Sequence, residues 1–146
     1  MDNSYRLTLE ETPDANDLDF VRERLNEFNR LHVEDDNYKP LAIFLRDHQG
    51  TIVAGLVGAT YWGWLHVELL WVDKELRHQG YGRKLLAAAE QEAIERGCRF
   101  AHLDTMSFQA RGFYENQGYD IFGELNDLPA GHSRYFMMKE LQPKSN

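Results

Sequence analysis

The sequence predicts a single α/β domain over residues 1–146, built on a mixed sheet, and three observations support this fold class. The length of 146 residues suits one domain with a core of its own, and no repeat or linker divides it. Stretches that alternate apolar and polar residues, as strands do, are interspersed with stretches whose apolar residues return at helical spacing. The apolar strand that ends at Val72 leads through a short turn of arginines and glycines directly into a helix.

The N-terminal part is expected to hold a strand and the first helix. Residues 5–9 alternate as a strand does, and Pro13 and Asp14 then open a helix. A polar loop at 34–37 follows, with an extra helical turn near Tyr38. The apolar positions of the helix are Leu18, Val21, Leu25 and Phe28.

A β-hairpin is expected next, followed by a further strand. Residues 41–46 and 51–61 form its strands, and the turn between them contains Gly50, which permits a backbone conformation that other residues resist. The following strand spans 64–72. Glycines within and between these strands indicate bulges or bends: Gly55, Gly58 and Gly63.

The C-terminal half is expected to alternate helices and strands. The helix after the glycine turn ends at Gly97, and a strand follows at 99–104. Because a strand, helix and strand form a right-handed crossover, this strand should lie parallel to the strand at 64–72. A short helix at 109–117 comes next. Two antiparallel strands, 119–124 and 134–141, close the sheet around a loop at 126–133.

Composition excludes several classes of protein. A net charge of −8, from 24 acidic and 16 basic residues, argues against nucleic-acid binding. The six histidines show no metal-binding spacing, so no metal site is expected. No apolar run approaches the roughly 18 residues that span a bilayer, and the first residues do not resemble a signal peptide. With Cys98 as its one cysteine, the protein is expected in the reducing cytoplasm, away from membranes.

The turn at 77–84 has the features of an anion-binding cradle. Gly80 and Gly82 have no side chain to hold a ligand away, so the backbone N–H groups of residues 78–83 can converge on phosphate oxygens. Arg77, Arg83 and Lys84 add positive charge. The turn lacks the Walker and dinucleotide-binding patterns, which argues against a plain nucleotide-binding module. A tight turn without a ligand remains the simpler alternative.

The pattern R-x-x-G-x-G from Arg77 to Gly82 resembles the pyrophosphate loop of the GNAT superfamily of acyl-CoA-dependent N-acetyltransferases. Residues 107–119 are similar to the family's stretch N-x-x-A-x-x-F-Y-x-x-x-G-F, with Ser107 in place of the usual Asn and Tyr119 in place of the usual Phe. The resemblance covers roughly residues 5–141. It implies the GNAT fold, a mixed and mostly antiparallel twisted sheet with flanking helices and a central parallel strand pair.

The resemblance also implies acetyl-CoA as the acyl donor. The strand at 70–72 would part from its neighbour and bind the pantetheine arm through its backbone, with the N–H of Val72 facing the thioester oxygen. Ser107 departs from the family pattern, which weakens the contact expected there. The residues implied in binding are Leu70, Trp71, Val72, Arg77, His78, Gln79, Gly80, Tyr81, Gly82, Arg83, Lys84, Ser107 and Tyr114.

Catalysis by direct attack of an amine on the thioester needs an acid and a base. By the resemblance, Tyr114 would protonate the departing thiolate; the alternative is an aromatic residue of the core. Strand alternation predicts that His66, Glu68, Leu70 and Val72 share one side, and the family's glutamate base falls nearest His66 or Glu68. Glu68 is favoured, because a carboxylate attracts an ammonium group and relays its proton.

The sequence therefore predicts an N-acetyltransferase that acts on a small amine through a ternary complex. The alternatives are a peptide or protein amine as acceptor, and a non-catalytic sensor domain that binds acyl-CoA. A cationic acceptor is expected from the net charge and the acidic residues Glu34, Asp35, Asp36 and Glu68. A homodimer, and closure of the loop at 126–133 over the substrate, are left open.

Overall fold

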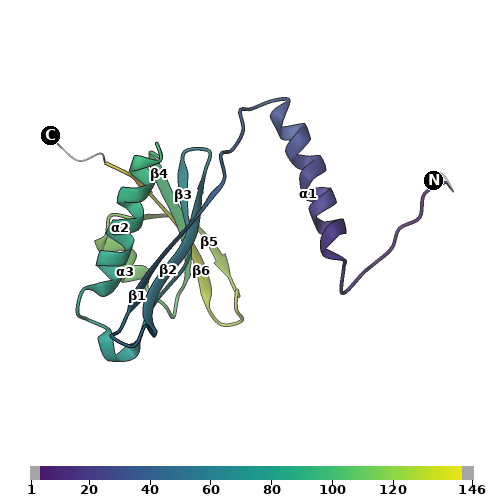
Figure 1. Ribbon diagram of the computed structural model, residues 1–146. Coiled ribbons are helices and arrows are strands. Elements are labelled where there is room, and N and C mark those ends of the chain that lie inside the picture. Colours follow the sequence, from purple (N-terminus) through teal and green to yellow (C-terminus); the bar gives the residue numbers. More distant parts are fainter. Residues whose placement is uncertain (1–3, 143–146) are drawn as a thin grey trace. The chain divides into compact units, whose positions relative to one another are not determined.

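The computed structural model describes residues 4–142 (Figure 1). The chain divides into two compact units, Met1–Asp35 and Asp36–Asn146. Within residues 4–142, no helix is both long and apolar enough to cross a membrane.

The first unit contains the helix α1 (Ala15–Arg30), as the sequence predicts. The side chain of Asp14 caps it by accepting a hydrogen bond from the N–H of Asn16 at 2.7 Å. No residue of α1 is buried. The predicted strand at 5–9 is wrong: these residues are exposed and pair with no strand. Alternation alone does not hold a strand, because its backbone groups need a partner.

The second unit is a six-stranded sheet with two helices, which confirms the predicted fold class. All neighbouring strands are antiparallel except β3 and β4, the parallel pair at the centre. The strands are β1 (Lys39–Arg46), β2 (Ile52–Tyr61), β3 (Trp64–Val72), β4 (Phe100–Met106), β5 (Asp120–Asn126) and β6 (Ser133–Glu140), in the order β1-β2-β3-β4-β6-β5.

The helices α2 (Tyr81–Glu95) and α3 (Arg111–Asn116) lie on one face of this sheet (Figure 1). A 3₁₀ turn, Lys74–Leu76, precedes α2, whereas the helical turn expected near Tyr38 is not formed. The core between sheet and helices contains the fully buried side chains of Leu56, Leu65, Leu86 and Met137.

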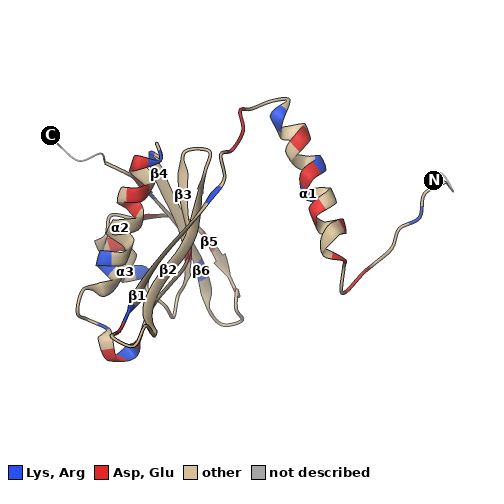
Figure 2. Ribbon diagram, in the orientation of Figure 1, with Lys and Arg blue, Asp and Glu red and all other residues tan. Residues whose placement is uncertain are grey.

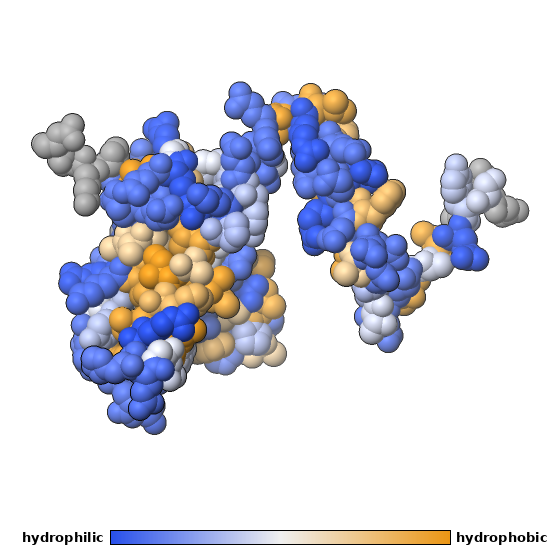
Figure 3. Space-filling view, viewed as in Figure 1, coloured by the Kyte–Doolittle hydropathy of each residue, from blue (hydrophilic) through white to orange (hydrophobic). Residues whose placement is uncertain are grey.

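Charged residues occur mainly on the helices and turns, and the strands are largely uncharged (Figure 2). In the space-filling view, hydrophobic residues gather over the middle of the unit that holds the sheet, with hydrophilic residues at either end (Figure 3). The face of the sheet opposite α2 and α3 is not covered by a helix of this unit. We call it the open face; it carries the side chains of Trp64, His66, His102, Phe136 and Met138.

A β-bulge at Glu68 interrupts β3. Val57 pairs with Leu69 and Gly58 pairs with Val67, so Glu68 is an extra residue without a partner in β2. Position 58 must be glycine, because a Cβ there would lie 2.1 Å from the carbonyl oxygen of His66. The sequence predicted a bulge or bend at Gly58, and the bulge opposite Gly58 confirms it.

The bulge reverses the faces of β3. Before it, Leu65 and Val67 lie in the core and His66 on the open face; after it, Leu70 and Val72 pack against the core. The expectation that His66 shares one side with Leu70 and Val72 is therefore wrong. It assumed an unbroken alternation, which one inserted residue shifts by a full face.

Candidate active site

A gap opens between the two central strands at the bulge. The parallel pairing of β3 with β4 ends at Val67 and Leu103, whereas β4 continues to pair with β6 as far as Met106. The N–H of Asp73 bonds to the carbonyl oxygen of Val53 in β2 at 2.9 Å. Because N–H groups alternate along a strand, those of Val72 and Leu70 point away from β2, into the gap. Two backbone donors thus face the space between the strands.

The turn before α2 forms the predicted cradle of backbone donors. His78 (φ 63°) and Gly80 (φ 85°) both adopt the left-handed conformation, which alternates with ordinary residues in anion-binding nests. The first helical bond runs from the N–H of Lys84 to the oxygen of Gly80. The N–H groups of Tyr81, Gly82 and Arg83 therefore precede the helical ladder and are open to a ligand.

Positive charge surrounds these donors. The first turn of α2 carries no acidic residue, and within residues 4–142 Arg77, Arg83 and Lys84 form no ion pair. The side chain of Arg77 donates from Nε to the carbonyl oxygen of Val72 at 3.1 Å, which ties the turn to the end of β3. Cations at a helix N-terminus are unfavourable without an anion, so this arrangement fits a phosphate ligand such as the pyrophosphate of coenzyme A.

Tyr114 on α3 is buried in the core and meets Phe113 and Tyr119 edge to face. Burial, with a smaller effect of the Asp104 carboxylate, raises the pKa of Tyr114 to about 12. Its hydroxyl makes no hydrogen bond to any other residue of the described chain. The phenol thus packs as a core residue, and its protonated hydroxyl is available to a ligand.

Alkaline pH is expected to destabilise the fold, with Tyr114 responsible for part of the loss. An unfolded tyrosine loses its proton near pH 10, whereas Tyr114 in the fold keeps its proton up to about pH 12. This stability is fully present below pH 10 and is lost as the pH rises toward 12, by about 1 kcal/mol at pH 11. Urea unfolding between pH 8 and pH 11 checks this, since Tyr114→Phe should lose less stability than the wild type. Equal losses would contradict it.

Ser107 follows directly after β4 and joins two segments of the chain. Its N–H donates to the carbonyl oxygen of Ser133 at 2.7 Å, and its Oγ accepts from the N–H of Ser133 at 3.0 Å. These bonds extend the pairing of β4 with β6. The hydroxyl proton of Ser107 remains available for a further contact.

On the open face, two histidines from the parallel strands stack against each other. The rings of His66 and His102 are 4.4 Å apart between centroids and nearly parallel, with 2° between their planes. The hydroxyl of Tyr61 lies 3.2 Å from Nε2 of His102. Burial, followed by the neighbouring His66, lowers the pKa of His102, although Asp104 opposes the shift. His102 therefore favours the neutral imidazole, which can accept a proton.

Glu68 lies at the bulge, exposed to solvent, just beyond the last parallel pair. Burial raises the pKa of Tyr61, and the Glu68 carboxylate adds to the rise, so Glu68 acts electrostatically on the Tyr61 hydroxyl. The structure brings both expected base candidates, His66 and Glu68, to the edge of the gap.

Sequence reasoning missed Tyr61 and His102. The alternation of Phe100, His102 and Asp104 along β4 was the available signal, but only the strand register places His102 beside His66.

Comparison with known proteins gives consistent matches. Residues 5–119 match the model of the acetyltransferase (GNAT) family. The chain is 37% identical over 131 residues to an acetyltransferase of Agrobacterium fabrum, covering 90% of this chain and 96% of the relative. It is 40% identical over 107 residues to blasticidin-S acetyltransferase of Streptomyces morookaense, covering 70% and 79%. A crystal structure of an acetyltransferase from Agrobacterium tumefaciens superposes with a TM-score of 0.87 at 36% identity, covering 93% of this chain and 99% of that one.

Proposed function

The chain belongs to the acetyltransferase (GNAT) family, and on that premise we propose that it moves an acetyl group from acetyl-CoA to a primary amine of a small molecule by direct attack. It is an acetyl-CoA-dependent acetyltransferase. One observation gives the strongest support to direct attack of the amine on acetyl-CoA. Backbone donors face the gap between β3 and β4, the cradle lies at the start of α2 on one side of the sheet, and His66 lies on the open face with Glu68 at the bulge. A donor and an acceptor could therefore meet from opposite sides of the sheet.

The residues of the gap fit a thioester donor. Acetyl-CoA supplies a carbonyl carbon that takes up the amine while its bond to sulfur breaks. The N–H groups of Leu70 and Val72 donate to the carbonyl oxygen as it gains negative charge. The N–H groups at the start of α2, with Arg77, Arg83 and Lys84, hold the pyrophosphate.

Two side chains handle protons in this proposal. Glu68, assisted by the neighbouring His66, takes the proton that the amine must lose to become and remain neutral. Tyr114 donates a hydrogen bond to the leaving sulfur. The pKa of Tyr114 is about 12, whereas that of a thiol is near 8.5. Tyr114 is therefore the weaker acid, and it stabilises the thiolate by a hydrogen bond while keeping its own proton.

A small-molecule acceptor is favoured over a peptide because one relative is named for its action on blasticidin-S. A location in the cytoplasm and a single domain over residues 1–146 stay predictions, and a homodimer stays open.

The function is tested by a screen of amines, with free-thiol release from acetyl-CoA as the signal. Amino acids, polyamines, aminoglycosides, alkylamines and peptides are compared at equal concentration. Basic small amines are expected to react faster than acidic ones, since Glu68 and the net charge of −8 attract cations. Faster reaction of peptides would support the protein-acetylating alternative. Acetyl-CoA binding without any turnover would support the sensor alternative.

Glu68→Gln is expected to lower turnover at pH 7 and to lose less at pH 9. An alkylammonium group has a pKa near 10, so at higher pH more of the acceptor is already neutral and a base matters less. The measurement is a pH–rate profile for wild type, Glu68→Gln and His66→Ala. A wild-type profile in Glu68→Gln would remove Glu68 from the mechanism, and the same pH-dependent loss in His66→Ala alone would assign the role to His66.

A further inference from the structure

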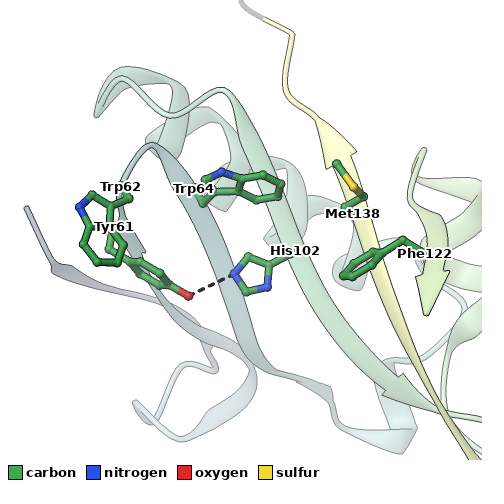
Figure 4. A pocket seen from close by; sticks show the side chains of 6 residues that line it. All are labelled: Tyr61, Trp62, Trp64, His102, Phe122 and Met138. Carbon is green, nitrogen blue, oxygen red and sulfur yellow. Dashed lines mark hydrogen bonds between the residues drawn. The ribbon is translucent and has the colours of Figure 1, made fainter. Parts of the chain in front are cut away.

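The open face contains a hollow of about 420 Å³ beside the histidine pair (Figure 4). It lies where the ends of β2 and β6 meet the beginnings of β3, β4 and β5. The residues that line it are Tyr61, Trp62, Trp64, His102, Phe122 and Met138.

The lining is aromatic and uncharged. None of the six lining residues carries a carboxylate, ammonium or guanidinium group. The Tyr61 hydroxyl and the His102 imidazole bond to each other, as Figure 4 shows. An aromatic ring placed there would meet the faces and edges of other rings.

Neighbouring contacts hold the walls in place. Trp64 stacks on Phe100 with 4.8 Å between ring centroids and meets His102 at 71°, while Tyr61 meets His102 at 89°. Phe122, on β5, is 61% exposed and forms an outer wall of the hollow. A ring that entered would find Trp64, Tyr61 and His102 already held by their neighbours, and this lowers the entropic cost of binding.

The hollow lies within reach of the proposed base. His102 lines it and stacks on His66, and Glu68 follows His66 by two residues along β3. The two strand residues from His66 to Glu68 span about 7 Å, and the four from Trp64 to Glu68 span about 13 Å. A group in the hollow and a group at Glu68 are therefore separated by roughly 7–13 Å.

We propose that the hollow binds an aromatic ring of the acceptor, so that the substrates are amines joined through a spacer to a planar ring. The ring lies among Tyr61, Trp64 and Phe122 while the amine reaches Glu68 and His66. The placement of the amine rests on the proposed acetyl transfer, but the placement of the ring does not.

Matched amines test the substrate class. ω-Phenylalkylamines with spacers of two to eight carbons are compared with ω-cyclohexylalkylamines and plain alkylamines of the same spacer length. The phenyl compounds are expected to show the highest kcat/KM at an intermediate spacer, about 2- to 10-fold above their cyclohexyl partners, because contacts between aromatic rings add to simple burial. Equal values for all three classes would overturn the proposal and leave the acetyltransferase function intact.

Two exposed phenylalanines give a variant and its matched control. Phe122→Ala removes a wall of the hollow, whereas Phe44→Ala removes a ring that is 45% exposed on the same face but outside it, since its neighbours Ile43 and Leu45 pack on the core side. Phe122→Ala should raise KM for phenylalkylamines by about 3- to 10-fold and leave KM for alkylamines unchanged. Phe44→Ala should change neither.

Binding without turnover separates the two proposals. In the presence of coenzyme A, a phenylalkylamine should alter the tryptophan fluorescence of the wild type and of Phe44→Ala, and bind more weakly to Phe122→Ala. This result would support the ring site even if no amine were acetylated. No binding to the wild type, or equal binding to all three proteins, would overturn it.

Discussion

Gly82→Glu is expected to abolish acetyl-CoA binding, with a loss of affinity of at least about 100-fold. The substitution places a carboxylate among the open N–H groups of Tyr81, Gly82 and Arg83, where it would occupy the phosphate volume and repel its charge. The fold should survive. A Cβ at position 82 would meet the ring of Phe113 at 3.5 Å, an ordinary contact, and Gly82 has no positive φ.

Calorimetric titration with acetyl-CoA measures this loss, and two further variants separate its causes. Gly82→Ala should keep the helix or stabilise it by up to about 1 kcal/mol, since alanine is the better helix former. Gly82→Gln adds the same bulk as glutamate without its charge, so its affinity should fall between the other two. Wild-type affinity in a folded Gly82→Glu protein would show that the cradle does not bind the cofactor.

Tyr114→Phe is expected to lower turnover by about 10- to 1,000-fold, with little change in acetyl-CoA affinity. Phenylalanine keeps the edge-to-face contacts with Phe113 and Tyr119 and removes only the hydroxyl. Because the pKa of Tyr114 is raised to about 12, the hydroxyl is protonated throughout the working range. The loss should therefore be the same at pH 6 and at pH 9.

Tyr119→Phe is the matched control for this prediction. The Tyr119 hydroxyl donates to Oε2 of Glu90 at 2.7 Å, and Lys139 donates to the other carboxylate oxygen at 2.8 Å. Its removal should cost about 1 kcal/mol of stability and leave turnover unchanged. Turnover of Tyr114→Phe equal to that of the wild type, with the chemical step rate-limiting, would reduce Tyr114 to a core residue.

Local patterns predicted most of the helices and strands, because the spacing of apolar residues within each one is visible in the sequence. The strand at 64–72 matches β3 in full, and the helix that begins at the glycine turn ends before Gly97 as expected. The strand at 5–9 failed because its alternation says nothing about a partner. In the structure these residues have no regular secondary structure and are exposed.

The site depended on register, which sequence spacing does not supply. In the sequence, Glu68 fits the alternation of the strand like its neighbours. Only the pairing of β3 with β2 shows that Glu68 is an extra residue without a partner. His66 and His102 are separated by a whole helical crossover, so their stacking follows from the pairing of β3 with β4 and from no local pattern. The glycines and cations of the turn predicted the cradle, and the family resemblance supplied Tyr114, but neither pointed to an aromatic lining for the acceptor.

The bulge that Gly58 permits divides β3 between two tasks. Beyond Glu68 the N–H groups of Leu70 and Val72 face the gap where we propose that the donor binds, and these groups are the same whatever side chains occupy positions 70 and 72. Before Glu68, the side chains of Trp64 and His66 lie on the open face, where we propose that the acceptor binds, whereas Leu65 and Val67 lie in the core. If the proposed site is correct, substitutions on the open face in the first half of β3 should change which amines are recognised and leave the backbone contacts to acetyl-CoA unchanged.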